Sequence, residues 1–216
     1  MAISRSSEHD WSAAAPVVMP ILRPPGAAGL DAGGLDRAGL LLSRGAAGGL
    51  TLHWPGPLGI PIAVVIPGDG YDALVNPEHL VSWDVEPREV LSTALANLAT
   101  WSNSTPWEEE TSGTRRLLVS DSGERWDAAR ILLLEVCVFL ERELGKDVRV
   151  LVGIPSRHLL VAGALAADDP AFADDFQAFV AAEAEGADEP IDGRIFELVG
   201  GGLTELVGGV TELGGS

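Results

Sequence analysis

The chain is short of cysteine, of basic residues and of long apolar runs, and each shortage excludes a class of protein. Cys137 is the single cysteine among 216 residues, so no intramolecular disulfide can form, and we expect a buried thiol in a reducing compartment. Lysine and arginine number 14 against 32 aspartates and glutamates, which gives a formal net charge of -18. This charge repels nucleic-acid phosphates and anionic lipid headgroups, so we expect neither as a partner.

The chain also lacks the patterns of membrane insertion and secretion. No apolar run reaches the roughly 18 residues that a membrane-spanning helix needs. The first fifteen residues include Glu8, His9 and Asp10 and have no long apolar core, so they do not resemble a secretory signal. We therefore expect a cytoplasmic protein that is not bound to a membrane, with residues 1–15 as a flexible N-terminal segment.

Patterns for metal binding and catalysis are missing as well. The histidines are scattered, with no pair at the spacing of ligands on one helix or hairpin: His9, His53, His79 and His158. A lone cysteine cannot complete a zinc site, and neither a Gly-x-Ser-x-Gly elbow nor a phosphate-binding loop is found. We predict no metal site, no cofactor and no catalytic residues, and so a non-catalytic protein.

Strand and helix patterns are what the sequence does contain. Strands are predicted at 17–22, 40–42, 51–54, 62–66, 115–120, 148–152, 159–162 and 195–199, and helices at 86–101, 126–144 and 170–185. Segment 103–113 is expected to be a polar loop. The strands 148–152 and 159–162 are too close for a parallel crossover, so they form an antiparallel hairpin. This order predicts a single α+β domain over 16–199, with helices packed on a mainly antiparallel sheet.

Residues 200–216 are expected to be a Gly-rich tail outside that domain. Within it, LTELVGG is followed by VTELGG, with corresponding residues seven positions apart. Repeated glycine pairs destabilise an isolated helix, which favours a flexible tail. The alternative is a docking peptide whose Leu206 and Leu213 fill pockets on a partner and which becomes ordered on binding.

Three segments carry a family resemblance: ALANL at 94–98, WDAARILL at 126–133 and IPSRHLL at 154–160. In this order they resemble the YtpQ-like family of uncharacterised bacterial proteins, over about 16–199. The family pattern has an acidic residue after the Ser156-Arg157 pair, where this chain has His158. The α+β arrangement is also broadly similar to the small chaperones of bacterial secretion systems. A similar arrangement of elements does not establish function.

Arg157 and His158 are candidate ligand-binding residues. They fall in the predicted hairpin turn, where a guanidinium can hold a carboxylate or phosphate with two hydrogen bonds. The alternative is a structural ion pair between Arg157 and an internal acid such as Glu135 or Asp121. Glu135 falls within an apolar helical stretch, where a carboxylate needs a cation or a raised pKa.

Three further side chains are candidates for ligand or partner binding. Asn97 lies in the apolar register of its helix, so its amide must hydrogen-bond a neighbouring loop or a ligand. Trp101 and Trp107 flank the predicted polar loop. They either mark a binding surface or cover the edge of a core.

The acidic residues are concentrated between 168 and 192, a stretch without lysine or arginine. It forms either a solvated face or a docking face for a basic partner. The sequence therefore predicts a cytoplasmic adaptor, chaperone or accessory subunit of a larger bacterial assembly, which binds a protein through this face or through the tail. Assembly into a homo-oligomer is a variant of this hypothesis. The alternative function is a small-ligand-binding protein or an enzyme that uses Arg157, His158 and a nearby carboxylate.

Overall fold

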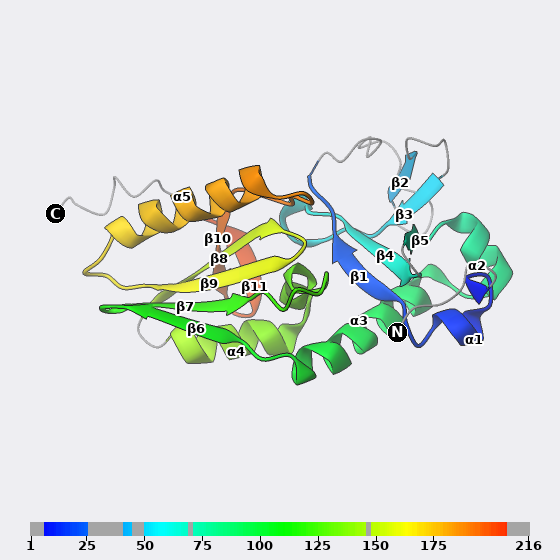
Figure 1. The fold of residues 1–216 in the computed structure, drawn as a ribbon, viewed down its shortest axis with the longest axis horizontal. Coiled ribbons are helices and arrows are strands. Elements are labelled where there is room, and N and C mark those ends of the chain that lie inside the picture. Colours follow the sequence, from blue (N-terminus) through cyan, green and yellow to red (C-terminus); the bar gives the residue numbers. More distant parts are fainter. Residues whose placement is uncertain (1–6, 26–40, 45–49, 69–70, 146–147, 207–216) are drawn as a thin grey trace. The chain divides into compact units, whose positions relative to one another are not determined.

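The computed structural model describes residues 7–25, 41–44, 50–68, 71–145 and 148–206, without the side chains of 41–44. The chain forms two compact units, which are Met1–Ser104 and Thr105–Ser216 (Figure 1). Both consist of helices and mainly antiparallel strands, so the α+β prediction is confirmed. The sequence predicted a single domain over 16–199, whereas the structure has two units. Each unit forms its own sheet from strands that are close in sequence. Hydrophobic periodicity predicts strands but not which strands pair, so it does not reveal this division.

Unit 1 is built on a three-stranded antiparallel sheet in the order β1-β4-β5. Its strands are β1 (Met19–Leu22), β4 (Ile62–Pro67) and β5 (Asp72–Leu74), and β2 (Leu41–Arg44) pairs with β3 (Leu50–His53) in a separate ladder. Nearly all of β4 is buried. Pro20, which cannot donate a ladder hydrogen bond, lies in β1 at the edge of the sheet.

Unit 1 has three α-helices, of which the first lies in the N-terminal segment. They are α1 (Trp11–Ala14), α2 (Pro77–Trp83) and α3 (Pro87–Ser104), with a short 3₁₀ turn at Pro57–Gly59. α3 packs on β1, with Val90, Ala94 and Leu98 buried. The sequence predicted a flexible segment over 1–15, but residues 7–15 include α1, whose first turn is capped by Asp10.

Unit 2 is built on a six-stranded sheet in the order β11-β10-β8-β9-β7-β6, in which every neighbouring pair is antiparallel. Its strands are β6 (Glu108–Ser112), β7 (Arg115–Ser120), β8 (Arg149–Ser156), β9 (Leu159–Leu165), β10 (Ile195–Val199) and β11 (Gly202–Glu205). The predicted hairpin of 148–152 and 159–162 is present as β8 and β9. The two edge strands β6 and β11 lie where the sequence predicted a loop and a tail.

Pairing with a neighbour, rather than intrinsic propensity, accounts for both edge strands. β6 begins with three glutamates, which are poor strand formers, and all of its residues are exposed. β11 is turned back onto β10 by Gly200 and Gly201, whose φ values of 59° and 78° lie in the left-handed region that glycine tolerates. The first glycines of the predicted tail are therefore turn residues inside unit 2.

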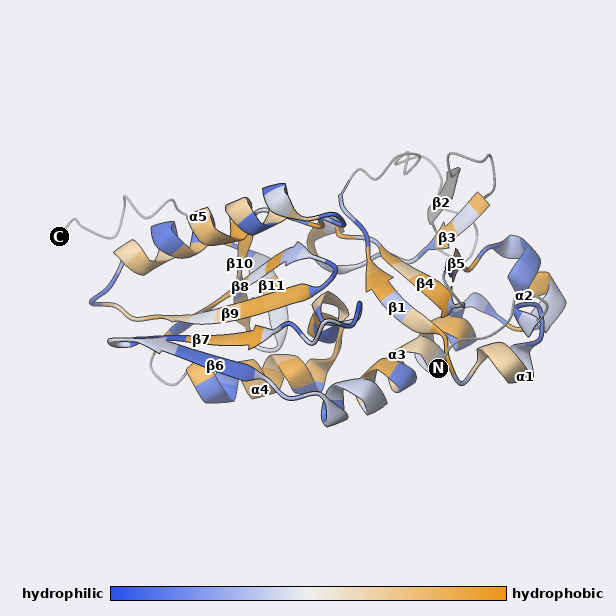
Figure 2. Ribbon diagram, viewed as in Figure 1, coloured by the Kyte–Doolittle hydropathy of each residue, from blue (hydrophilic) through white to orange (hydrophobic). Residues whose placement is uncertain are grey.

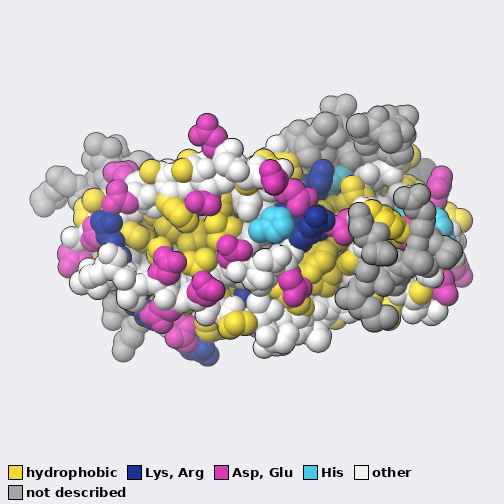
Figure 3. Space-filling view, viewed as in Figure 1, with side chains coloured by type: hydrophobic (Ala, Val, Ile, Leu, Met, Phe, Trp, Pro, Cys, Tyr) yellow, Lys and Arg dark blue, Asp and Glu magenta, His cyan; other side chains and the backbone are white. Residues whose placement is uncertain are grey.

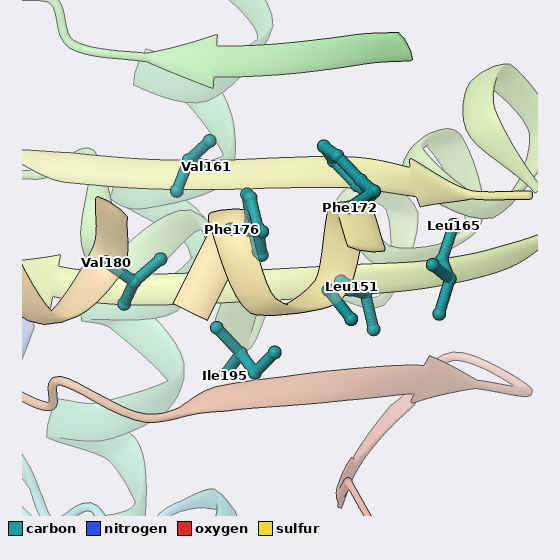
Figure 4. Close-up of a cluster of buried hydrophobic side chains, with 8 residues drawn as sticks. Leu151, Val161, Leu165, Phe172, Phe176, Val180 and Ile195 are labelled. Carbon is teal, nitrogen blue, oxygen red and sulfur yellow. The ribbon is translucent and has the colours of Figure 1, made fainter. Parts of the chain in front are cut away.

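One face of this sheet is covered by α5 (Ala171–Gly186). Strand alternation directs Leu151, Val161 and Ile195 to the face on which Phe172, Phe176 and Val180 of α5 pack (Figure 4). Two glycines allow the close approach of this helix. A Cβ atom on Gly153 would lie 2.3 Å from Val180, and one on Gly163 would lie 2.6 Å from Phe172.

α4 (Leu134–Leu144) lies on the opposite face of the sheet. Arg116, whose side chain alternates with that of Leu117, donates a hydrogen bond to the Glu143 carbonyl of α4. The single helix predicted over 126–144 is interrupted. A 3₁₀ turn (Ala128–Leu132) precedes α4, and Leu133 between them is extended, with φ -92° and ψ 119°.

One side of α4 is open to solvent. Leu134 and Val138 are exposed, and so is Glu135 of the apolar helical stretch. β1, β4 and β9 are strongly hydrophobic, whereas β6 is hydrophilic (Figure 2). Among the described residues, no helix is both long enough and apolar enough to cross a membrane.

Candidate functional site

Arg157 and His158 lie in the turn between β8 and β9, and both contact Glu189. Arg157 is only 6% exposed, its Nη1 lies 3.2 Å from Glu189 Oε1, and its guanidinium lies over the Trp126 ring at 5.3 Å. His158 Nε2 is 3.3 Å from the other carboxylate oxygen. The turn therefore directs both side chains toward an acid of the same unit.

Backbone hydrogen bonds fix the position of that acid. The Arg157 amide donates to the Glu189 carbonyl at 3.0 Å, and Ile191 donates to the Pro155 carbonyl at 2.9 Å. The segment around Glu189 thus extends the antiparallel pairing of β8. Of the two alternatives drawn from the sequence, this geometry matches the structural ion pair, although the partner is Glu189 rather than Glu135 or Asp121, which are both exposed.

A buried polar network at the end of β7 was not singled out from the sequence. The Asp127 carboxylate is fully buried and accepts hydrogen bonds from the Ser120 hydroxyl at 2.6 Å and from the Ser122 hydroxyl and amide at 2.8 and 3.1 Å. Arg130, which is 2% exposed, donates to the Ser120 hydroxyl at 2.7 Å. Acid and base three residues apart in one helical turn are the sequence signal that could have revealed this network.

Arg130 also determines the place of Trp107. Its guanidinium lies 4.2 Å from the Trp107 ring centroid and donates to the Thr105 carbonyl at 3.1 Å, while Trp107 stacks on Phe139 at 5.7 Å. Burial lowers the pKa of Arg130 to about 10, against the opposing field of Asp127. Trp107 is therefore half-buried as part of an internal arrangement that holds the start of unit 2.

The candidate residues of unit 1 belong to α3. The Asn97 amide donates to the backbone carbonyls of Ala15 and Val18 at 2.8 and 2.9 Å. Of the two partners considered for this amide, the structure shows the neighbouring loop. Trp101 is half-buried on the same helix, in a different unit from Trp107.

The two leucines of the docking-peptide hypothesis have different outcomes. Leu206 is partly buried and packs against the cluster beneath α5, so it covers the core of its own unit. The docking role of Leu206 stays a prediction. Leu213 lies outside the described residues.

An apolar groove remains open between α5 and the hairpin of β6 and β7. Its volume is about 300 Å³. It is lined by Leu117, Phe172, Phe176 and Phe179, and its polar rim consists of Glu110, Thr111, Ser112, Arg115 and Asp175. In the space-filling view, apolar side chains gather between α5 and β6, with acidic side chains around them (Figure 3). Phe179 of this lining is 41% exposed.

Arg115 lies on the rim of the groove and is held by two acids. Its Nε and Nη2 donate to the two carboxylate oxygens of Asp169 at 2.6 and 2.9 Å, and its Nη1 donates to Asp175 at 2.8 Å. The hydrogen bonds from Arg115 lower the pKa of Asp169 below its ordinary value. Two carboxylates therefore surround one guanidinium, and Glu110 leaves the rim with an excess of negative charge.

Among the described residues, one group has ligand atoms suitable for a metal ion: Glu8, His9 and His79 of unit 1, whose candidate atoms lie within 4.8 Å of one another. Nothing in the sequence pairs His9 with His79, because α1, five strands, a 3₁₀ turn and the start of α2 lie between them. The fold brings them together, contrary to the expectation of scattered histidines.

Comparisons with known proteins place no constraint on this site. No family model, no curated protein and no solved structure matches the chain. The resemblances to the YtpQ-like family and to secretion chaperones therefore stay predictions.

Proposed function

We propose that the protein is a non-catalytic cytoplasmic adaptor or accessory subunit, and that the groove of unit 2 binds a basic, amphipathic segment of a partner protein. The observation that carries this proposal is the exposed apolar lining between α5 and β7, bordered by acids. No observation at Arg157 and His158 favours the alternative function as an enzyme or small-ligand binder.

The groove has an apolar lining because α5 covers only part of its face of the sheet. α5 covers β8, β9 and β10, and the strands β7 and β6 extend beyond it. Leu117 is therefore only half-buried, and Phe179 presents an exposed ring beside it. Aromatic side chains in a groove are typical anchors for a peptide, because they bury a large area at little cost in conformational entropy.

The charge of the rim selects the occupant. Within the acidic stretch 168–192, Asp169, Asp175, Glu189 and Asp192 pair with arginines, whereas the other five acids are exposed. Of those exposed acids, Asp174 lies on α5 beside the groove residue Asp175. Lysine or arginine in the partner would complement this field and accelerate association.

The same charge argues against two other occupants. A second copy of the chain carries the same net charge of -18, so two copies repel each other at this face. The chain's own last ten residues, VGGVTELGGS, contain Glu212 and no basic residue. A basic partner segment is the occupant that the charges favour.

Selection from a displayed peptide library against the full-length protein tests this proposal. We expect enriched peptides to combine Lys or Arg with large apolar residues, and to lose binding to the variants Phe179→Ala and Glu110→Lys. Phe179→Ala removes an exposed ring, and Glu110→Lys reverses a rim charge, so neither change disturbs the core.

Matched controls separate the groove from general surface effects. Val81→Ala removes an exposed apolar side chain from α2 of unit 1, and Glu185→Lys reverses an exposed charge near the C-terminal end of α5. Both control variants should bind like the wild type. Enrichment of acidic peptides, or binding that both groove variants retain, would contradict the proposal.

A further inference from the structure

The cluster of Glu8, His9 and His79 joins the N-terminal segment of unit 1 to α2. The His9 and His79 rings stack at 4.8 Å, and Trp83 Nε1 donates to the Glu8 carbonyl at 2.9 Å. Candidate ligand atoms from the two imidazoles and the carboxylate lie within 4.8 Å of one another. Two imidazoles and one carboxylate are the ligand set of many zinc sites that keep an open coordination position.

Hydrogen bonds prepare His9 as a ligand. The Ser82 hydroxyl donates its only proton to the Glu78 carbonyl at 2.9 Å, and it lies 3.2 Å from His9 Nδ1. Because that proton is already used, His9 Nδ1 is the donor in this second contact. The lone pair is then on His9 Nε2, which lies 3.9 Å from the Glu8 carboxylate. Metal-bound histidines in proteins are commonly oriented in this way by a partner on the other nitrogen.

Glu8 and His79 supply the other two candidate ligands. The Tyr71 hydroxyl donates to one oxygen of the Glu8 carboxylate at 3.4 Å, and the other oxygen faces His9. His79 is 3% exposed, and its Nε2 is buried without a hydrogen-bond partner within the described part of the chain. A buried polar nitrogen without a partner is destabilising, which marks Nε2 as the atom of His79 that is open to an occupant.

We propose that Glu8, His9 and His79 bind one divalent transition-metal cation, with Zn²⁺ as the best match for two imidazoles and a carboxylate. Ligand atoms around tetrahedral zinc are about 3.3 Å apart for bonds of about 2.0 Å. The exposed side chain of His9 can rotate to close the difference.

Cation binding has one structural consequence at α2. In the structure the Asn76 amide donates to His79 Nδ1 at 3.2 Å as half of a capping box, which places the ring proton on Nε2. A cation at Nε2 moves that proton to Nδ1 and breaks this hydrogen bond. The other half of the box, from the His79 amide to the Asn76 side chain, is unaffected.

Titration of the full-length, tag-free protein with Co²⁺ and Zn²⁺ tests this proposal. Co²⁺ is followed by its visible absorption, and Zn²⁺ by competition with a chromophoric chelator. We expect one ion per chain, and at least a tenfold loss of affinity in each of the variants His9→Gln and Glu8→Gln. His9 is exposed, so His9→Gln removes a ligand without disturbing the fold.

His158→Gln is the matched control, because His158 also lies beside a glutamate but outside this cluster. It should bind both metals like the wild type. The proposal would be overturned if neither Co²⁺ nor Zn²⁺ bound at 100 μM, or if wild type and His9→Gln had equal affinities. The cluster would then be a stack of aromatic rings that holds the N-terminal segment on α2.

Discussion

Two buried arginines in unit 2 are stabilised in the same way. Arg130 lies over Trp107 and Arg157 over Trp126, and each guanidinium also forms polar contacts inside the unit. A guanidinium removed from water keeps part of its solvation through the aromatic face and through hydrogen bonds. We therefore expect both arginines to stabilise the folded protein, since their polar partners would lose a hydrogen-bond donor or a counter-charge without them.

Replacing Arg130 with methionine tests this role. The change leaves the buried Asp127 carboxylate without its cation, so we expect a loss of about 3 kcal/mol in the free energy of unfolding. Arg142→Met, at an exposed position on α4, should change it by less than about 0.5 kcal/mol. Urea unfolding followed by circular dichroism measures both values. Equal stabilities of the two variants would contradict the role given to Arg130.

Sequence patterns identified several polar residues at the residue scale but not their partners. Asn97 was expected to hydrogen-bond a loop or a ligand, and its register indicated why, yet only the fold shows that Ala15 and Val18 accept its protons. Similarly, the internal ion pair of Arg157 was anticipated, but Glu189 is brought to it by a segment that follows α5. Partners far apart in sequence leave no periodic signal.

Among the elements, α5 determines the shape of the candidate binding site. Its inner residues Phe172, Phe176 and Val180 pack on the sheet, and its flank with Asp175 and Phe179 forms one wall of the groove. The close approach of the helix depends on Gly153, which leaves room for Val180. Packing of the core and the width of the groove are thereby coupled.

Gly153→Ala should destabilise the protein through this contact. The added methyl group would lie 2.3 Å from Val180, so helix and sheet must separate. We expect a loss of about 1 to 3 kcal/mol in the free energy of unfolding, measured by urea denaturation. Gly186→Ala, at the end of the same helix with open space around it, is the control and should be neutral or slightly stabilising. A destabilisation of the same size at both positions would refute the packing argument.

Elements with strong patterns were predicted well, and elements defined by their neighbours were not. The helix at 170–185 and the hairpin of β8 and β9 are confirmed within a few residues. β6 and β11 were missed because their strand character comes from pairing at a sheet edge. The break at Leu133 was missed because apolar residues continue on both sides of it. The groove could not be predicted, because it lies beyond the strands on which α5 packs, and the sequence does not show which strands these are.

At the scale of the whole molecule, the two units differ in how their charges respond to acid. In unit 1, burial and the charge of Arg23 lower the pKa of His53 to about 4, and burial also lowers that of His79. In unit 2, hydrogen bonds from Arg115 and Arg149 lower the pKa values of Asp169 and Glu197. These groups titrate in different pH ranges.

Unit 1 should therefore lose stability first as the pH falls. A histidine in the unfolded chain binds a proton below about pH 6.5, whereas His53 in the folded protein does so only near pH 4. The contribution of neutral His53 to stability is therefore present above pH 6.5 and is lost as the pH falls from 6.5 to 4. The contributions of Asp169 and Glu197 are lost only below their ordinary pKa values of 3.8 and 4.5. Hydrogen exchange with EDTA present, corrected for intrinsic rates, should show weaker protection of unit 1 at pH 5 than at pH 7, with unit 2 unchanged.

His53→Gln provides the control for that experiment. It should reduce the pH dependence in unit 1, while His158→Gln in unit 2 should leave it as in the wild type. Equal loss of protection in both units between pH 7 and pH 5 would show that other groups dominate the acid response.

The most direct test of the account is the affinity of a selected basic, amphipathic peptide for the groove, measured by fluorescence anisotropy on the full-length protein. We expect binding that weakens at higher salt, because opposite charges at the rim are screened. We also expect a loss of at least tenfold in Phe179→Ala and no change in Val81→Ala. Affinity that is independent of salt and equal in all three proteins would contradict the assignment of unit 2 as a binding module for basic partner segments.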